Sequence, residues 1–333
     1  MKAWVSHEAG GPERLVLEEM PKPSPSDGEL LIRVEAVGVN FPDSLLIRDL
    51  YQVKPARPLV PGSELCGIVE NVGSGVTQFE RGDVVIGRCG WGAMSEYVSL
   101  DQGRCVRIPP SLPRAEAAAF LFTYATAYHA LHDAARLQAN ETLLVLGAAG
   151  GVGSAAVEIG HAMGARVIAA ASSEAKLAFA RSKGAADALV YDPHLQPGDG
   201  QKIFTSKLKE LAPMGVDVVF DPVGGPYSEP TLRALARGGR HLVVGFTAGI
   251  PRVPLNLTLL KSSQIIGVDW RMFVQEHPDR NASNVDSLLA MWQNGLIAPK
   301  VTELFQLFEA PAAIARLESR EAVGKVVVSF SRN

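Results

Sequence analysis

The stretch VLGAAGGVGSAA, residues 145–156, constrains the fold of this chain more than any other segment. It follows an apolar strand predicted over 142–148 and opens a helix that stops at Gly164, which is the setting of a dinucleotide-binding turn. Aligned to G-x-G-x-x-G, the three key positions are Ala148, Gly150 and Gly153. Gly150 lets a pyrophosphate approach the backbone, Gly153 permits close helix–strand packing, and the helix N-terminus offers N–H groups to phosphates. The predicted nucleotide-binding residues here are Ala149, Gly150, Gly151, Val152 and Gly153.

The end of the next strand indicates which nucleotide is bound. An NAD site has an acidic residue about 20 residues beyond the glycine motif, where it accepts from the ribose 2′-hydroxyl. This chain has Ser172 there, and Lys176 follows one helical turn later. A hydroxyl and an ammonium suit a 2′-phosphate, so the pattern predicts NADPH. Glu174 leaves an alternative open, because a shift of one or two residues would bring a carboxylate to the ribose.

Strands alternate with helices from residue 142 onward, which is typical of a parallel, doubly wound sheet. An Ala-rich helix is predicted over 114–137, before the first of these strands. The strands are nearly all apolar, as expected when both faces of a parallel sheet are buried. They are predicted at 142–148, 166–171, 186–191, 216–221 and 240–246.

The first third of the chain has a different character. Short alternating runs such as LLIRVEAVGVN are separated by Gly/Pro-rich turns, which indicates a small β-barrel or sandwich. The last sixty or so residues carry a strand at 265–270, a helix at 285–295 and a strand at 324–330, and they do not continue the βα alternation. We therefore predict an α/β protein with a discontinuous first domain, 1–122 and 266–333, and a cofactor domain over 123–265.

Composition excludes several classes of function. With 333 residues, 47% hydrophobic and 20% charged, the chain is long enough for two full cores and is not disordered. A net charge of -3 gives no reason to expect nucleic acid or an anionic membrane as a partner. No run of about 20 apolar residues is present, and the charged, glycine-broken start is unlike a secretory signal. A cytoplasmic location is therefore expected.

Cysteines and histidines give no metal-binding pattern. Cys66, Cys89 and Cys105 are widely spaced and form no C-x-x-C pair, so they are expected to be reduced thiols in or near the core. His129 and His132 share a helical face but have no cysteine or carboxylate partner at ligand spacing in the sequence. We predict no bound metal.

Taken together, the ordered blocks of this sequence resemble the zinc-free quinone oxidoreductases of the medium-chain dehydrogenase/reductase superfamily, a group that includes zeta-crystallin. The resemblance covers nearly the whole chain. It implies a GroES-like β-barrel catalytic domain, a Rossmann-type cofactor domain, an active site in the cleft between them, and a homodimer joined through cofactor-domain strands, with SSQIIGVDW as a candidate segment. The blocks are GGPERLVL, GVNFPDSLLIRDLYQVKP, PGSELCGIVENVGSGV, FERGDVV, TYATAYHAL, GAAGGVG, FDPVGG, VVGFTAG and GKVV.

The resemblance also explains why the loop PGSELCG lacks a histidine. Zinc-dependent relatives place a cysteine just after the GV of the third strand and a histidine in a G-H-E loop, and these positions correspond here to Asn40 and Ser63. Neither residue is a good zinc ligand. Removing hydride from an alcohol is difficult without a Lewis acid, whereas quinones and activated enones accept hydride directly. The expected activity is therefore NADPH-dependent reduction of a quinone or enone.

Residue roles follow from the same resemblance. Asn40 is expected beside the nicotinamide and Tyr51 in the substrate pocket, both as donors to the substrate carbonyl, with Tyr51 a proton source. The alternative is that both only shape the pocket. Thr126, Phe246 and Thr247 are expected near the nicotinamide, and Tyr191 near the adenosine phosphate. Asp43 and the Ser63–Glu64 pair are expected to be structural.

The chain departs from the family pattern at Asp49, where glycine is common, and over 269–279, and these departures concern the shape of the pocket rather than the class of reaction. Three other functions stay open: a zinc-type alcohol dehydrogenase with unrecognised ligands, a non-catalytic NADPH-binding protein of the crystallin kind, and an enoyl-thioester or alkenal reductase.

Overall fold

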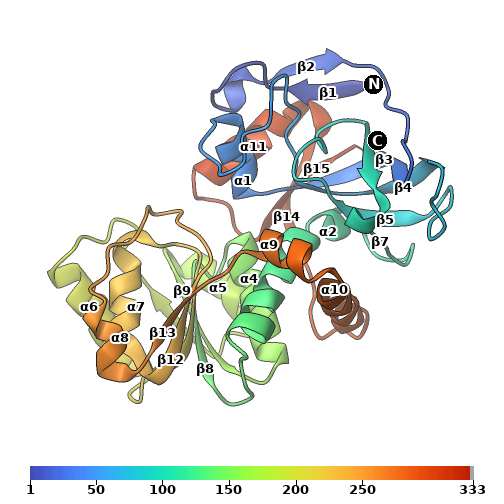
Figure 1. Cartoon of the computed structure of the whole chain (residues 1–333). Coiled ribbons are helices and arrows are strands. Elements are labelled where there is room, and N and C mark those ends of the chain that lie inside the picture. The colour runs from blue at the N-terminus through green and yellow to red at the C-terminus, as the bar shows by residue number, and fades with distance from the viewer. Residues whose placement is uncertain (331–333) are drawn as a thin grey trace. The chain divides into compact units, whose positions relative to one another are not determined.

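The chain divides into two units, and the first consists of Met1–Phe122 and the residues from Pro299 onward. Most strands of this unit pair antiparallel. The computed structural model describes residues 1–330. Figure 1 shows the strands and helices of each unit. The strands of the first unit are β1 (Lys2–Val5), β2 (Val16–Glu19), β3 (Glu29–Val39), β4 (Glu64–Val72), β5 (Val84–Arg88), β6 (Tyr97–Asp101), β7 (Cys105–Arg107), β14 (Val301–Gln306) and β15 (Lys325–Ser329), and its helices are α1 (Phe41–Ile47), α2 (Arg114–Ala118) and α11 (Ala310–Glu318).

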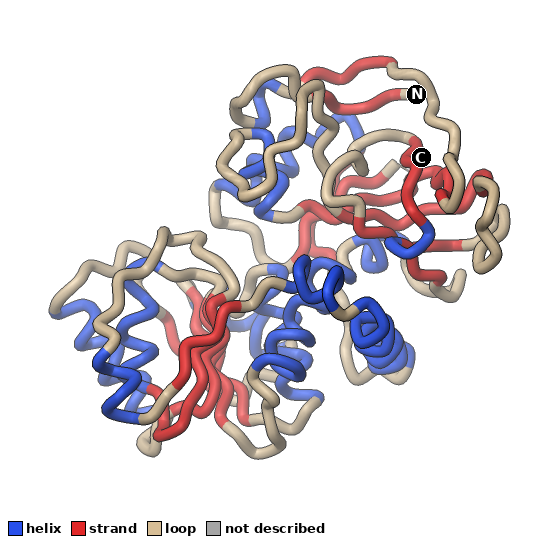
Figure 2. The backbone as a smooth tube through the Cα atoms, viewed as in Figure 1, coloured by secondary structure: helices blue, strands red, loops and turns tan. Residues whose placement is uncertain are grey.

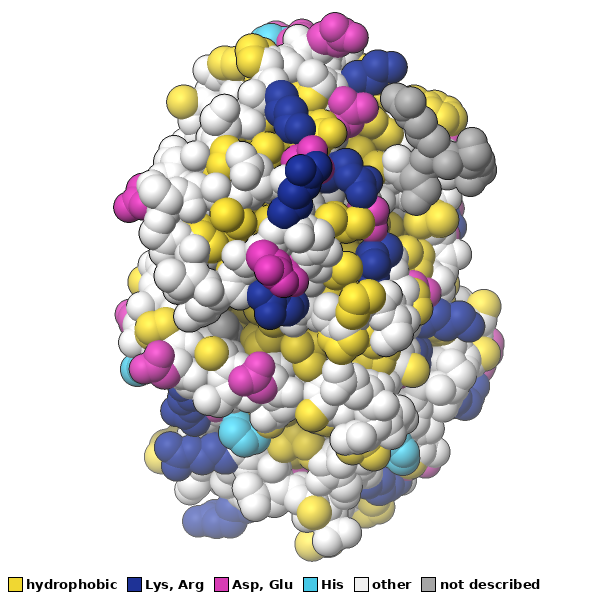
Figure 3. Space-filling view, turned by 90° about the vertical axis from the view of Figure 1, so that its right-hand side faces the viewer, with side chains coloured by type: hydrophobic (Ala, Val, Ile, Leu, Met, Phe, Trp, Pro, Cys, Tyr) yellow, Lys and Arg dark blue, Asp and Glu magenta, His cyan; other side chains and the backbone are white. Residues whose placement is uncertain are grey.

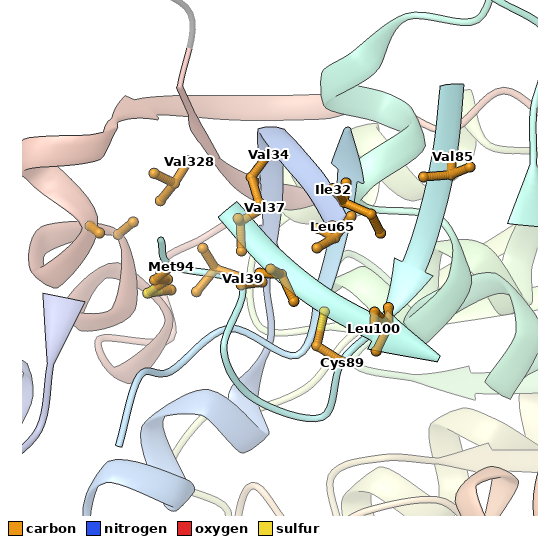
Figure 4. Packing of buried hydrophobic residues seen from close by; sticks show 14 of the residues in the cluster. Ile32, Val34, Val37, Val39, Leu65, Val85, Cys89, Met94, Leu100 and Val328 are labelled. Carbon is orange, nitrogen blue, oxygen red and sulfur yellow. The ribbon is translucent and has the colours of Figure 1, made fainter. Parts of the chain in front are cut away.

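The central strand of this unit is β3, because β15 and β4 both pair with it antiparallel and β6 joins it at its N-terminal half. The strand order of the sheet is β14-β15-β3-β4-β5-β7. Apolar side chains of these strands form one core, and Figure 4 shows Val34, Val37 and Leu65 within it. Burial of this cluster fixes which side chains of β3 face inward.

The second unit, Thr123–Ala298, is a six-stranded parallel sheet with helices on both faces. Figure 2 shows its strands side by side. The strand order β10-β9-β8-β11-β12-β13 is the Rossmann order 3-2-1-4-5-6 counted from β8. The strands are β8 (Thr142–Leu146), β9 (Arg166–Ala171), β10 (Asp187–Val190), β11 (Val216–Asp221), β12 (Leu235–Val243) and β13 (Gln264–Gly267). The helices are α3 (Thr126–Tyr128), α4 (Gly151–Ala162), α5 (Glu174–Ser182), α6 (Asp199–Leu211), α7 (Ser228–Ala234), α8 (Asn256–Lys261), α9 (Trp270–Glu276) and α10 (Pro278–Gln293), with π-helical turns at Leu121–Ala125 and His129–Ala134.

The second domain boundary differs from the sequence prediction. The first change of unit falls after Phe122, where it was expected, but the chain leaves the cofactor unit after Ala298 rather than at 265/266. The reason is that β13 is the sixth strand of the parallel sheet, and α10 is tied to the 129–134 turn by Asn284 and Arg280, which both contact Asp133 at 2.7 Å. The sequence after residue 264 does not continue the alternation of strands and helices, so the extension of the cofactor unit to Ala298 was not predicted.

A buried ion pair holds both ends of the cofactor unit. Lys183 Nζ lies 2.8 Å from Glu158 Oε1, and both side chains are at most 7% exposed. The Tyr124 hydroxyl donates to the other oxygen of Glu158, and the backbone N–H of Ala298 donates to Oε1 at 3.2 Å. One carboxylate on α4 therefore binds residues next to both points at which the chain changes unit.

Candidate active site

The glycine-rich turn lies after β8, at the point where the strand order reverses between β8 and β11. This is where open parallel sheets bind their ligands. A Cβ at Gly153 would lie 2.2 Å from the carbonyl oxygen of Gly147, so only glycine permits this helix–strand contact. A Cβ at Gly150 would meet that oxygen at 3.4 Å, an ordinary contact, so the space above Gly150 is not needed by the protein itself. The tight bend itself is at Gly147, with φ +58°.

The predicted phosphate-binding pair is brought together by the end of β9 and the start of α5. Lys176 Nζ donates to Ser172 Oγ at 3.2 Å. Ser173 caps α5, with its hydroxyl accepting from the backbone N–H of Lys176 at 3.4 Å. Glu174, the residue that left NADH open, is largely exposed and pairs with Arg181 at 3.4 Å. An ammonium beside a hydroxyl, with the carboxylate held elsewhere, suits a phosphate better than a ribose hydroxyl.

Other predicted cofactor residues lie at the same edge of the sheet. Tyr191 follows β10, and Phe246 and Thr247 follow β12, so with the turn after β8 they stand beyond the carboxyl ends of parallel strands. The Tyr191 ring lies 4.8 Å from that of Tyr227. Phe246 is 47% exposed, and the Thr247 hydroxyl contacts the carbonyl of Pro222 at 3.3 Å. Thr126 begins α3 and is half-buried.

In the catalytic unit, strand register brings together residues far apart in the sequence. Gly38 is paired with Glu64 across β3 and β4, and Val39 with Val326 across β3 and β15. Asn40, directly after β3, therefore lies next to the first residues of both partner strands, Glu64 and Lys325. A Cβ at Gly38 would come within 2.5 Å of Glu64 Oε1, so the glycine of the GVN block makes room for that buried carboxylate.

A closed network of hydrogen bonds results. Asn40 Nδ2 donates to Glu64 Oε1 at 2.9 Å and lies 3.2 Å from both Ser63 Oγ and the Gly38 carbonyl. Lys325 Nζ donates to Asn40 Oδ1 at 2.7 Å and to Glu64 Oε1 at 3.1 Å. The second Glu64 oxygen accepts from the Phe122 backbone N–H at 2.9 Å.

Asp43 lies beneath this network on α1. Its Oδ2 accepts from the backbone N–H of Asn40 at 2.7 Å, while Oδ1 has no hydrogen-bond partner within residues 1–330. Burial raises the pKa of Asp43 to about 7, against the lowering effects of the Asn40 N–H and the Lys325 charge. The side chain thus holds the backbone at the start of α1, as a structural residue does.

These residues do not fit a zinc ion. An amide, a hydroxyl and a lysine ammonium meet where zinc-dependent relatives place ligands, and an ammonium repels a metal cation. Among the described residues, no group of three His, Cys, Asp or Glu is arranged to hold a metal. Burial raises the pKa of Cys66 and of Cys89 to about 12, which keeps both as neutral thiols and poor ligands. No step of the reaction is therefore assigned to a metal.

Tyr51 lies in the loop after α1 and is half-buried. Its predicted contact with substrate stays a prediction. Asp49, in the same loop, pairs with Arg57 at 2.7 Å, so its carboxylate is neutralised inside the domain. That contact accounts for a carboxylate at a position where the family commonly has glycine.

Comparisons with known proteins agree with both units. Residues 26–110 match the alcohol dehydrogenase GroES-like domain, and residues 151–284 match the zinc-binding dehydrogenase domain. Quinone oxidoreductase-like protein 2 of Bos taurus is 35% identical over 95% of this chain and 89% of its own length. The chain belongs to the zinc-free quinone oxidoreductases of the medium-chain dehydrogenase/reductase superfamily. The predicted family and fold class are confirmed, and the chain is an oxidoreductase.

Two solved structures bear on the chemistry of this family. Escherichia coli quinone oxidoreductase complexed with NADPH is 27% identical, with a TM-score of 0.89 over 99% of this chain and 100% of that one. The predicted cofactor agrees with that complex. The CurK enoyl reductase is 30% identical, with a TM-score of 0.86 over 98% of both chains.

Sequence reasoning missed three contributors to the site. Gly147 was passed over because the motif was aligned one residue later. Glu64 was predicted only to be structural, and Lys325 appeared only as the lysine of the GKVV block. The contact between Glu64 and Lys325 joins residues 261 positions apart. It depends on strand register, which has no local signal in the sequence.

Proposed function

We propose that this protein is an NADPH-dependent reductase of quinones or related α,β-unsaturated carbonyls that needs no metal. The observation that carries the proposal is the closed network around Asn40, where an amide and a hydroxyl occupy the two expected ligand positions and a lysine ammonium lies beside them. Without a Lewis acid, the substrate itself must be electrophilic. Quinones and enones meet that condition, since charge developing on their oxygen needs only hydrogen-bond donors or solvent.

The cofactor domain supplies the binding residues. When bound, NADPH supplies hydride from nicotinamide C4. The backbone of the turn and of the first turn of α4 binds the pyrophosphate, which fits the room left above Gly150. Ser172 and Lys176 bind the 2′-phosphate, and Tyr191 contacts the adenosine phosphate. The residues assigned to the backbone cradle are Ala149, Gly150, Gly151, Val152 and Gly153, and those assigned to the nicotinamide end are Asn40, Thr126, Phe246 and Thr247.

On the substrate side, Tyr51 donates to the carbonyl oxygen and provides the proton that follows hydride transfer. The predicted donor role of Asn40 is harder to sustain, because its two amide protons already have three acceptors within the domain. Donation to a substrate would require one of these bonds to be exchanged. Within residues 1–330, its Oδ1 accepts one hydrogen bond, from Lys325, and keeps a second lone pair.

The protein is proposed to act as a homodimer. Within the described chain, β13 stands at the end of the parallel sheet and pairs only with β12. Nearby Leu255, Leu259 and Leu260 are between 67% and 81% exposed, and Ile265 on β13 is 38% exposed. An edge strand flanked by exposed apolar side chains favours pairing with a second copy.

An enoyl thioester is the second candidate substrate, favoured by the likeness to the CurK enoyl reductase. A non-catalytic NADPH-binding role is the remaining alternative. RNA is not expected as a partner, because the net charge is -3, and the one face drawn in Figure 3 mixes Lys and Arg with Asp and Glu. Every helix in residues 1–330 is too short or too polar to cross a membrane, and the cytoplasmic location stays a prediction.

Steady-state oxidation of NADPH and NADH, measured against a quinone, a 2-alkenal and an enoyl thioester, tests the proposal. We expect turnover with NADPH and with the quinone or the alkenal. Turnover only with the thioester would select the second candidate. Binding of NADPH without turnover on any of the three would reject the proposed activity and favour the non-catalytic role.

A further inference from the structure

Lys325 and Lys183 are the buried lysines among the described residues. The side chain of Lys325 is 7% exposed, and its three ammonium protons have three acceptors: Asn40 Oδ1 at 2.7 Å, Glu64 Oε1 at 3.1 Å and the Val39 carbonyl at 3.2 Å. A lysine and a glutamate buried together contribute little net stability, because desolvation of the two charges offsets their attraction. Stability alone therefore gives no strong reason for this pair.

The chemistry of the pair determines how the Asn40 amide is turned. An ammonium has only donors, so the Asn40 atom that faces it must be the oxygen. The Glu64 carboxylate and the Gly38 carbonyl have only acceptors, so the atom that faces them must be the nitrogen. Lys325 and Glu64 thus fix the same orientation, Lys325 through the oxygen of the amide and Glu64 through its nitrogen.

That orientation decides what Asn40 can offer a ligand. Its two N–H groups have acceptors at 2.9, 3.2 and 3.2 Å, whereas Oδ1 has one hydrogen-bond partner among the described residues and two lone pairs. As held, the side chain can accept one further hydrogen bond. If the Asn40 amide were rotated by 180°, its NH₂ group would face the Lys325 ammonium, and two donors would then meet.

We propose that Lys325 is the positioning residue of the reductase reaction, and that its ammonium holds Asn40 as a hydrogen-bond acceptor toward the bound nicotinamide carboxamide. This inference rests on the proposed function. The ammonium takes no proton from and gives none to the substrate; it acts only through Asn40. The competing reading is that Lys325 merely neutralises a buried Glu64 and has no influence on turnover.

The variant that separates these readings is E64Q/K325M. It removes both charges together, so Glu64 does not remain as a buried carboxylate without its cation, and the amide introduced by E64Q can present either its oxygen or its nitrogen to Asn40. We expect a folded protein whose Kd for NADPH stays within about threefold, because the phosphate contacts lie in the cofactor domain, and whose kcat falls at least about tenfold.

A comparison with N40A shows whether Lys325 acts through Asn40. If it does, N40A/E64Q/K325M has the same kcat as N40A, because the amide to be positioned is already gone. Losses that multiply in the triple variant would overturn the proposal, as would an E64Q/K325M kcat within about twofold of wild type.

The buried pair Glu158–Lys183 supplies the matched control. It is the same pair of residue types, equally buried, in the cofactor domain. E158Q/K183M is expected to change the free energy of unfolding about as much as E64Q/K325M does and to keep kcat within about twofold. An equal loss of kcat in both double variants would overturn the assignment to Lys325.

The variant K325R replaces E64Q/K325M if the double variant does not fold. A guanidinium also has only donors, so folded K325R is expected to keep kcat within about fivefold, and a kcat as low as that of N40A would overturn the proposal. Wild-type protein without turnover on a quinone, a 2-alkenal or an enoyl thioester would reject the proposed function itself and this inference with it.

Discussion

At the scale of single residues, we expect the contact between Lys176 and Ser172 to set the cofactor preference. A carboxylate at position 172 would repel a 2′-phosphate and attract the Lys176 ammonium, which now lies 3.2 Å from the hydroxyl. We expect S172D to lower kcat/KM for NADPH relative to NADH by at least about tenfold. Steady-state rates with both nucleotides measure this ratio. S182D, which adds the same charge at the far end of α5, should leave it unchanged; an unaltered ratio in S172D would show that Ser172 is not at the phosphate.

At the same scale, Asp43 is expected to make the free energy of unfolding depend on pH. Its pKa is raised to about 7 by burial, so between about pH 4 and pH 7 the folded protein holds a proton that the unfolded chain has lost. The contribution of Asp43 to the stability of the wild type should therefore fall over this window as the pH rises. D43N carries no such proton, so its free energy of unfolding relative to wild type should rise by up to about 4 kcal/mol across the window and then stay level. Urea unfolding at pH 5, 6, 7 and 8 measures the difference, and a constant difference would contradict the raised pKa.

The local sequence indicated the Ser172–Lys176 contact of the cofactor domain, but not the contacts among Asn40, Glu64 and Lys325 in the catalytic domain. Ser172 and Lys176 are four residues apart, so a strand end followed by a helix start is enough to bring them together. Asn40, Glu64 and Lys325 come from three strands, and only the register of β3 with β4 and β15 makes them neighbours. No periodicity in one segment contains that information.

At the scale of elements, the turn between β8 and α4 makes different demands on its two glycines. G153A should disrupt the fold locally, because its Cβ would lie 2.2 Å from the Gly147 carbonyl oxygen. G150A meets only an ordinary contact at 3.4 Å, so it should fold normally. We expect it to lose NADPH affinity, because its methyl group would occupy the space that the proposed function assigns to the pyrophosphate.

Thermal unfolding and NADPH titration of G153A and G150A separate these effects. We expect a lowered Tm for G153A and an unchanged Tm with at least about tenfold weaker NADPH binding for G150A. Wild-type affinity in G150A would place the pyrophosphate elsewhere. The strand–turn–helix unit was predictable because its signal is continuous, whereas the extension of the cofactor domain to Ala298 was not, because α9 and α10 interrupt the βα alternation.

At the scale of the whole molecule, the edge strand β13 predicts the oligomeric state. I265K places a charge among exposed apolar side chains beside an unpaired strand edge, which should oppose association. Sedimentation equilibrium should give a dimer for wild type and a monomer for I265K. I203K changes an isoleucine that is 58% exposed on α6 and should remain dimeric. A monomeric wild type, or a dimeric I265K, would contradict pairing through β13.

The central claim is that this chain reduces electrophilic carbonyl compounds without a metal, with Asn40 and Ser63 at the two positions where zinc-dependent relatives place ligands. The most direct test measures NADPH oxidation with a quinone on one protein sample before and after exhaustive dialysis against a chelator, with zinc determined in both. The account predicts the same kcat/KM in both samples, with zinc far below one atom per chain. Activity that disappears on dialysis and returns with added zinc would contradict it.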